Sequence, residues 1–353
     1  MSPPAAHPDA GHTMQCMEVW GGNSASDNGV VMPGLDAWVY SQPYQGDAGG
    51  GDVHYVSSCA TGRITRLLVA DVSGHGKAVA DVAVSLRNLM RRYINFVDQS
   101  RLIESLNKEF TELAEMGRFA TAVVATYWAP TDYLVACNAG HPRPLLYRAS
   151  SKTWELLKAP AKSSNPNDSE SGRSDQQKQS GRKPATESGL TSAGGGLVNL
   201  PLGIADLTGY DQFGVQLQKG DLVLIYTDSI IECKDAATGR MLGEQGVLAM
   251  MGQLNAEQPE TLIPLLLKKV ATITGDKEQG DDLTLLLLRH TGTRPARPVL
   301  QGLLAPLRIA GSVVSRLARG KSSPAALPEM SVPTIGGAMV PGLSRLWKAK
   351  GRW

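Results

Sequence analysis

The stretch that most constrains this chain is residues 69–76, where an apolar run ends in an acidic residue and a glycine-rich turn. Residues 67–70 have the composition of a buried strand, so Asp71 is expected to be the last residue of that strand. Two glycines flank His75 and allow a tight turn, after which a helix is expected near Lys77. A carboxylate held at a strand end is a typical ligand for a hard divalent cation. A polar turn that only ends a strand would have the same local sequence, so the rest of the chain has to decide.

Length and composition allow one large domain with appendages, or two domains. The chain has 353 residues, of which 42% are hydrophobic and 19% are charged, as in an ordinary soluble globular protein. The net charge of +2 does not indicate nucleic acid or any other charged partner. The charge is uneven, because the segment after His290 carries ten lysines and arginines and a single acid, Glu329.

The cysteines and the apolar runs predict a soluble, cytoplasmic protein. The four cysteines are far apart and form no Cys-x-x-Cys pair, which fits a reducing compartment; they are Cys16, Cys59, Cys137 and Cys233. No apolar run approaches the roughly 18 residues that span a bilayer, and the first residues lack the pattern of a signal peptide. No transmembrane segment is therefore expected.

The distribution of apolar residues divides the chain into four parts. Residues 1–34 are rich in Gly, Asn, Ser and Pro and are interpreted as an N-terminal extension, and residues 35–290 are interpreted as the folded domain. Residues 159–196 contain almost no apolar side chains, so we expect a disordered insertion that cannot bury enough surface to offset its ordering entropy. Residues 291–353 form a basic tail that is expected to be disordered.

One segment of the tail allows a second interpretation. Residues 299–318 interleave leucines and valines with arginines, a pattern that would suit peripheral contact with an anionic membrane or a partner. Pro306 and Gly311 weaken a continuous helix, which favours a solvated extension instead.

The periodicity of the domain predicts an α+β fold. Apolar residues recur at three- and four-residue spacing in four segments that we expect to be helices, at 77–97, 102–113, 244–254 and 259–273. Alternating or continuously apolar runs predict strands at 35–40, 52–57, 64–70, 119–128, 133–139, 144–147, 154–157, 213–217, 221–226 and 283–289. Strands 52–57 and 64–70 are expected to form a hairpin. Runs of strands interrupted by pairs of helices suggest two stacked sheets with helices outside.

Four acidic residues share one context, each lying at the end of an expected strand. They are Asp52 after three glycines, Asp71, Asp228 and Asp281. Carboxylates that converge would repel each other strongly unless cations lay between them, which predicts a dinuclear site. Ligands that are all oxygen favour Mg²⁺ or Mn²⁺ over zinc. Two such ions about 3.5–4 Å apart acidify a bridging water and neutralise phosphate oxygens.

The order of motifs resembles a known family. The segments GGD, DVSGHG, AGHPRPLLY, LPLGI, GDLVLIYTD and DDLT are similar to the SpoIIE-type branch of the metal-dependent (PPM, type 2C) serine/threonine protein phosphatases. The resemblance covers residues 35–289 apart from the insertion. It implies an αββα four-layer sandwich with two Mn²⁺ or Mg²⁺ ions between the sheets. It also implies hydrolysis of phosphoserine or phosphothreonine on a protein, without a phosphoenzyme intermediate.

The resemblance assigns metal ligands residue by residue. Asp71 resembles the ligand that bridges both metals. Asp52 and the backbone carbonyl of Val72 would complete one metal site, and Asp228 and Asp281 would hold the other.

Two further residues and two departures bear on the site. Asp282 is expected to contact the ligands and not the metal itself. His75 resembles the general acid that protonates the leaving oxygen. A turn histidine that hydrogen-bonds to the backbone would be equally compatible with the sequence. Ser229 stands where the family usually has glycine, so it is expected either to crowd the backbone beside Asp228 or to change the turn that forms there. Tyr55 replaces an acid that the family often has, without removing an expected ligand.

The remaining alternatives concern the reaction and the partners. His141 is expected to be structural because its setting is a sheet turn. The resemblance implies a phosphorylated regulator as substrate, typically an anti-anti-sigma-type protein. The main rival is a regulatory binding module that keeps the fold with little or no activity, and a third reading is a hydrolase of small phosphate esters. The oligomeric state stays open, with a dimer among the options.

Overall fold

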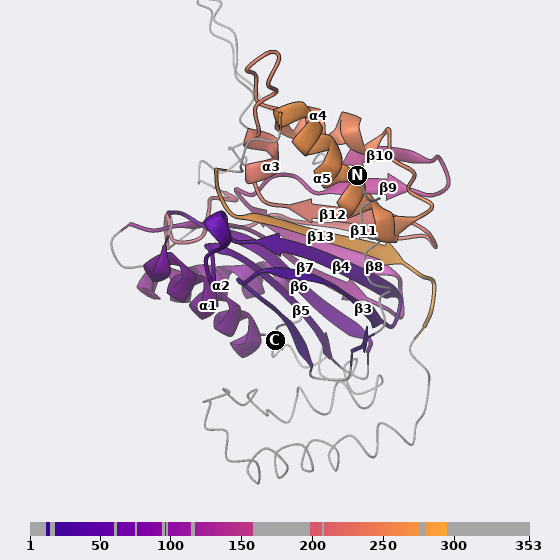
Figure 1. The fold of residues 1–353 in the computed structure, drawn as a ribbon. Coiled ribbons are helices and arrows are strands. Elements are labelled where there is room, and N and C mark those ends of the chain that lie inside the picture. Colours follow the sequence, from indigo (N-terminus) through magenta and orange to yellow (C-terminus); the bar gives the residue numbers. More distant parts are fainter. Residues whose placement is uncertain are drawn as a thin grey trace, which may run out of the picture.

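The computed structural model describes residues 12–14, 18–59, 62–74, 76–93, 96, 98–113, 117–157, 198–206, 208–275 and 280–294. These residues form an α+β fold in which two sheets stack face to face and helices cover both outer faces (Figure 1). The four-layer αββα arrangement expected from the sequence is confirmed.

The first sheet has seven strands in the order β1-β3-β4-β13-β12-β9-β10. Their bounds are β1 His12–Thr13, β3 Ser26–Met32, β4 Leu35–Gln42, β13 Leu283–His290, β12 Leu222–Tyr226, β9 Leu145–Arg148 and β10 Thr153–Leu156. Neighbouring strands are antiparallel, except that β1 and β3 are parallel. The end of β12 and the start of β13 therefore lie at the same edge of this sheet.

The second sheet has six strands in the order β11-β8-β7-β6-β5-β2, all antiparallel. Their bounds are β11 Gln212–Gln216, β8 Tyr133–Ala139, β7 Ala120–Trp128, β6 Ile64–Val72, β5 Asp52–Cys59 and β2 Val19–Gly22. Strands β5 and β6 form the predicted hairpin, which brings the start of β5 beside the end of β6.

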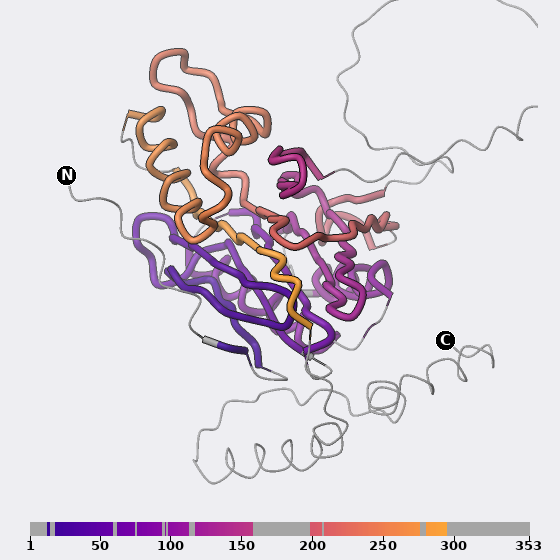
Figure 2. The backbone as a smooth tube through the Cα atoms, turned by 90° about the vertical axis from the view of Figure 1, so that its right-hand side faces the viewer, coloured from indigo at the N-terminus to yellow at the C-terminus, as the bar shows by residue number. Residues whose placement is uncertain are grey.

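The helices form the two outer layers. Helices α1 (Lys77–Arg92) and α2 (Gln99–Leu113) lie on the six-stranded sheet, while α4 (Gly243–Met251) and α5 (Pro259–Thr274) lie on the seven-stranded sheet. Two short elements complete the fold, the single-turn helix α3 (Ser229–Glu232) and the 3-10 turn η1 (Tyr44–Gly46). The chain between α3 and α4 projects from its layer in two perpendicular views (Figures 1 and 2). No helix in the described ranges combines the length and apolar composition needed to cross a bilayer.

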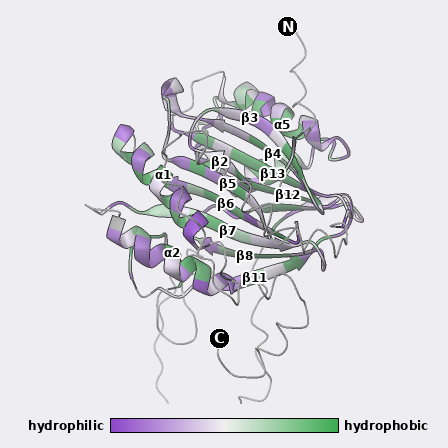
Figure 3. Ribbon diagram, turned by 90° about the horizontal axis from the view of Figure 1, so that it is seen from below, coloured by the Kyte–Doolittle hydropathy of each residue, from purple (hydrophilic) through white to green (hydrophobic). Residues whose placement is uncertain are grey.

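The sequence of strand β6 is continuously apolar because both faces of the strand are buried. Leu67 and Val69 point into the core between the two sheets, whereas Leu68 and Ala70 point into the core beneath α1 and α2. A strand that is buried on both faces has no solvent-exposed face, so polar and apolar residues do not alternate along it. The helices are amphipathic instead, with hydrophilic residues along their outer sides (Figure 3).

The structure differs from the sequence analysis at the N-terminus. Strands β1, β2 and β3 lie within the segment interpreted as an extension, and they add to the edges of both sheets. They are short and rich in glycine and polar residues, as edge strands often are, so their composition resembles that of a loop. Helix α1 also ends at Arg92, five residues before the expected end. The predicted insertion at 159–196 and the tail beyond residue 294 lie outside the described residues.

Candidate metal centre

The first two predicted ligands face each other across the β5–β6 hairpin. Asp52 opens β5, and its direct cross-strand partner is Asp71 near the end of β6. Asp52 is buried, with 3% of its surface exposed, and Asp71 is partly buried. Two carboxylates directly opposite each other destabilise a sheet when both are charged. The pair therefore calls for a compensating positive charge.

The other two predicted ligands approach from the seven-stranded sheet. Asp228 follows β12 and Asp281 precedes β13, and these strands are antiparallel neighbours. Their charges act on the first pair: burial, and then the charges of Asp228, Asp281 and nearby acids, raise the pKa of Asp71 to about 7. Acidic residues from four separate parts of the chain thus lie together where central strands of the two sheets end.

The acidic side chains are spaced more widely than the ligands of a bound metal ion. Among the described residues, no three acidic, histidine or cysteine side chains lie close enough together to hold a metal ion. The ligand assignment from sequence therefore stays a prediction.

The charge pattern tests whether these residues suit a cation. The pKa of Asp52 is raised well above its usual value by burial and by the charge of Asp71, against the opposing effect of hydrogen bonding. Burial, Glu232 and Asp281 raise the pKa of Asp228 as well. Each negative charge is therefore unfavourable beside the others, and a nearby divalent cation would reverse that effect. The donors are all oxygen atoms, so the group fits hard cations such as Mg²⁺ or Mn²⁺.

Asp282 accepts backbone hydrogen bonds through both of its side-chain oxygens. Its Oδ1 accepts the N–H of Tyr44 at 2.6 Å and its Oδ2 accepts the N–H of Gly51 at 2.5 Å. A Cβ on Gly50 would lie 2.4 Å from this carboxylate, and one on Gly51 would lie 2.7 Å from the carbonyl oxygen of Val72. Asp282 therefore holds the chain that leads into β5 at two points, one in η1 and one in the glycine run 49–51, which we call the glycine loop. This geometry supports the expected role of Asp282 behind the ligands.

Thr227 belongs to the site although the sequence analysis did not single it out. Its Oγ1 donates to Asp52 Oδ2 at 2.8 Å and accepts the N–H of Thr284 at 2.9 Å. The available signal was its position directly before the strand-end Asp228, where a buried hydroxyl lies beside the acids.

The turn after Asp71 has the expected backbone. Gly74 and Gly76 have φ angles of 104° and 86°, which favour glycine, and α1 begins at Lys77. His75 lies outside the described residues, so its role as general acid stays a prediction. Ser73 Oγ accepts the N–H of Phe119 at 3.0 Å, which ties the turn to the chain entering β7.

Of the two effects expected at Ser229, crowding of the backbone is not seen. Asp228 has helical angles (φ −67°, ψ −23°), and Ser229 is the first residue of α3 and lies outside the positive-φ region. The turn after β12 is thus helical and does not require glycine at Ser229. Tyr55, the other departure, is buried in the core beneath α1 and α2.

His141 is held by its surroundings as a structural residue. Its Nδ1 lies 2.8 Å from Thr121 Oγ1, and its main-chain N–H donates to Asn138 Oδ1 at 2.7 Å. Burial lowers the pKa of His141 to about 3, so the ring is neutral at physiological pH. Thr121 is the cross-strand partner of Asp71, so this histidine supports the strand next to the site.

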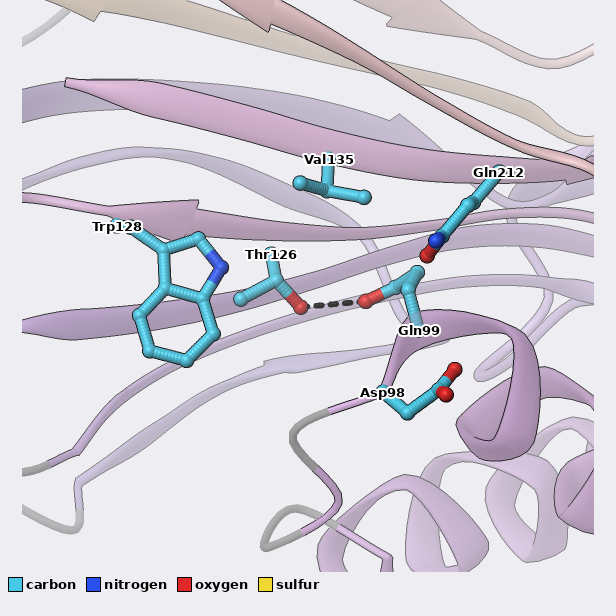
Figure 4. Close-up of a pocket in the computed structure, with 6 residues that line it drawn as sticks. All are labelled: Asp98, Gln99, Thr126, Trp128, Val135 and Gln212. Atoms are coloured by element: carbon cyan, nitrogen blue, oxygen red, sulfur yellow. Dashed lines mark hydrogen bonds between the residues drawn. The ribbon is translucent and has the colours of Figure 1, made fainter. Parts of the chain in front are cut away.

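A pocket of about 230 Å³ lies elsewhere, at the start of α2 on the outer side of the six-stranded sheet (Figure 4). Inside it, Thr126 Oγ1 donates to Gln99 Oε1 at 2.5 Å. The residues that line it are Asp98, Gln99, Thr126, Trp128, Val135 and Gln212. None of the predicted site residues belongs to this pocket.

Comparison with known families gives one match. The family model described as "Stage II sporulation protein E (SpoIIE)" matches residues 61–162 and 195–291, more than half of the chain. No curated protein matches the chain.

Several solved structures share the fold. The RsbU and RsbW domains of Rv1364c from Mycobacterium tuberculosis align with a TM-score of 0.54 at 23% identity, covering 76% of this chain and 62% of that one. The SiaA-PP2C domain of Pseudomonas aeruginosa aligns with a TM-score of 0.52 at 17% identity, covering 72% and 84%. The PP2C phosphatase domain with a regulatory fragment of SpoIIE from Bacillus subtilis aligns with a TM-score of 0.52 at 14% identity, covering 78% and 64%. The chain thus spans less than two thirds of the first and third structures, and at these identities the likeness shows the fold.

Proposed function

Because this chain belongs to the SpoIIE family, we propose that it is a metal-dependent protein phosphatase that hydrolyses phosphoserine and phosphothreonine on a regulatory protein. The observation that carries the proposal is the placement of four acids: Asp52 and Asp71 are cross-strand partners, and Asp228 and Asp281 lie at the adjoining ends of the neighbouring strands β12 and β13, where their charges act on Asp71. Such a group of carboxylates has little use in a binding module, whereas it suits a pair of hard cations.

We assign the ligands as the resemblance implies. Asp71 would contribute to both metals, Asp52 and the Val72 carbonyl would complete one site, and Asp228 and Asp281 would complete the other. When bound, two Mn²⁺ or Mg²⁺ ions supply an acidified water as nucleophile and neutralise the charge of the phosphate.

The chain's own residues orient the site and handle the proton. Asp282 holds the chain that leads into Asp52, through its hydrogen bonds to Tyr44 in η1 and Gly51 directly before β5. Ser73 is already engaged as an acceptor by the backbone of Phe119, which agrees with direct attack by water and no phosphoserine enzyme. His75 protonates the leaving seryl or threonyl oxygen in this proposal.

The substrate and setting rest on the family resemblance. We propose a phosphorylated anti-anti-sigma-type protein as substrate, in the cytoplasm. The rival is a regulatory module that binds such a partner and does not hydrolyse it.

Hydrolysis of p-nitrophenyl phosphate and of a phosphoserine protein, with and without Mn²⁺, tests the proposal. We expect turnover that requires metal and is lost in Asp71→Asn. Glu257→Gln is the matched control, because it also converts a carboxylate to an amide but at an exposed ion pair with Lys152. An inactive wild type that still binds the phosphorylated partner would support the binding module instead.

A further inference from the structure

Thr227 is a buried hydroxyl at the point where the two sheets meet the candidate metal centre. It lies between β12 and Asp228 and has no exposed surface. Its Oγ1 is 2.8 Å from Asp52 Oδ2, 2.9 Å from the nitrogen of Thr284 and 3.4 Å from the carbonyl oxygen of Thr284. Asp52 belongs to the six-stranded sheet, whereas Thr227 and Thr284 belong to the seven-stranded sheet and its edge.

These distances fix the direction of the hydroxyl proton. The N–H of Thr284 can only donate, so Thr227 Oγ1 accepts that bond and its own proton must point to another acceptor. The carboxylate of Asp52 is much closer than the carbonyl oxygen of Thr284, and a bond to a carboxylate is the stronger kind. Thr227 therefore donates to Asp52 and receives from Thr284.

The hydroxyl is one of two links between Thr227 and Thr284, because it accepts the N–H of Thr284. The main-chain N–H of Thr227 already donates to the carbonyl oxygen of Thr284 at 3.0 Å, so a side chain of the same shape without the hydroxyl would leave that link intact. The hydroxyl adds a contact that reaches across to the other sheet.

We propose that Thr227 is a positioning residue. Its hydrogen bond links Asp52 to the turn that carries Asp228, and so fixes the positions of ligands from the two sheets relative to each other for the metal pair. This inference rests on the proposed function, because it assigns a purpose to Thr227 only if Asp52 and Asp228 bind cations. Groups that orient metal ligands by hydrogen bonding typically change metal affinity by about 10- to 100-fold when they are removed.

The test is Mn²⁺ binding to the full chain, measured by isothermal titration calorimetry. Thr227→Val has nearly the shape of threonine and lacks the hydroxyl, so we expect its Kd for Mn²⁺ to rise by about 10-fold or more. Thr227→Ser keeps the hydroxyl, so we expect a Kd within about threefold of wild type even if loss of the methyl group lowers the melting temperature in EDTA.

Thr65→Val is the matched control. Thr65 is a fully buried strand residue at the opposite end of β6 from Asp71, and its Oγ1 has no hydrogen-bond partner among the described residues. The same chemical change there should leave the Kd for Mn²⁺ unchanged.

The outcomes separate the inference from the proposed function. A wild-type chain that does not bind Mn²⁺ contradicts the proposed function itself. A wild type that binds while Thr227→Val binds equally well overturns the positioning role. If Thr227→Val does not fold, a 10-fold loss of affinity in folded Thr227→Ser overturns it equally, because the hydroxyl is still present there.

Discussion

Asp52 and Asp71 are direct cross-strand partners at the end of the β5–β6 hairpin, although both carry carboxylates and Asp52 is buried. A sheet would gain stability from almost any other pair at this position, because opposed like charges are unfavourable. The arrangement is therefore unfavourable for folding, as we expect if the pair serves the proposed metal centre. It also makes the metal-free protein sensitive to pH.

Asp71→Asn should stabilise the metal-free protein at high pH. Burial and neighbouring acids raise the pKa of Asp71 to about 7, above its unfolded value, so the folded state binds more protons between pH 4 and 7. The stability that protonated Asp71 contributes is present below its unfolded pKa and is lost as the pH rises through 7. The variant should therefore be more stable in EDTA at pH 8, on the order of 2 kcal/mol, with little difference at pH 4.

Urea unfolding in EDTA at both pH values measures this difference. A variant that is less stable than wild type at pH 8 would contradict the electrostatic account. Wild type should in addition gain stability from Mn²⁺ at pH 8, and Asp71→Asn should not, because ligand binding to the folded state shifts the unfolding equilibrium.

Gly50→Ala should damage the glycine loop through a steric clash. The added Cβ would lie 2.4 Å from the carboxylate of Asp282, which already accepts the backbone of Gly51. We expect a loss of about 1–3 kcal/mol, as for other overpacked sites, together with weaker Mn²⁺ binding. In the control Gly22→Ala, the nearest heavy atom to the new Cβ is 3.8 Å away, so chemical denaturation should show little change. Equal stability of both variants would argue against the clash.

Most of the fold was predictable because the central strands and long helices have strong periodicity. The run 64–70 is apolar on both faces because β6 lies between two cores, and such a signal is visible in sequence. Strands β2 and β3 were not predicted, because their glycine and polar residues give them the composition of a loop, although β3 pairs with the adjacent strand β4 and β2 pairs with β5.

The candidate site was predictable in part for a similar reason. Acids at strand ends can be read from the sequence, and so can the hairpin that opposes Asp52 to Asp71. The role of Thr227 could not be read, because it depends on the distance between two sheets that only the folded chain defines. The sequence did not decide between the two effects expected at Ser229, because the choice depends on the helical turn of α3 that the chain forms there.

His141 should make the protein less stable in acid. Burial lowers the pKa of His141 to about 3, so the unfolded chain binds its proton first as the pH falls below 6.5. The stability from neutral His141 is present above the unfolded pKa and is lost as the pH falls toward the folded one. Replacement by Gln should remove this loss, which amounts to as much as about 1.4 kcal/mol per pH unit between pH 6 and 4.

The comparison of wild type with His141→Gln by urea unfolding across this range isolates the effect, since Asp71 contributes equally to both proteins. Parallel curves for the two proteins would mean that His141 does not titrate as its burial implies.

Asp281 and Asp282 are adjacent acids, and the same substitution should mainly affect metal affinity at Asp281 and stability at Asp282. Asp281 is exposed and lies at the edge shared with Asp228, so Asp281→Asn should weaken Mn²⁺ binding with little change in stability. Asp282 is 7% exposed and uses one oxygen for Tyr44 and the other for Gly51. Asp282→Asn replaces one acceptor with an N–H group that faces another N–H, so unfolding should become easier by roughly 1–3 kcal/mol. Calorimetric Mn²⁺ titration and urea unfolding of both variants measure the contrast, and a stable Asp282→Asn with lost metal binding would make Asp282 the direct ligand instead.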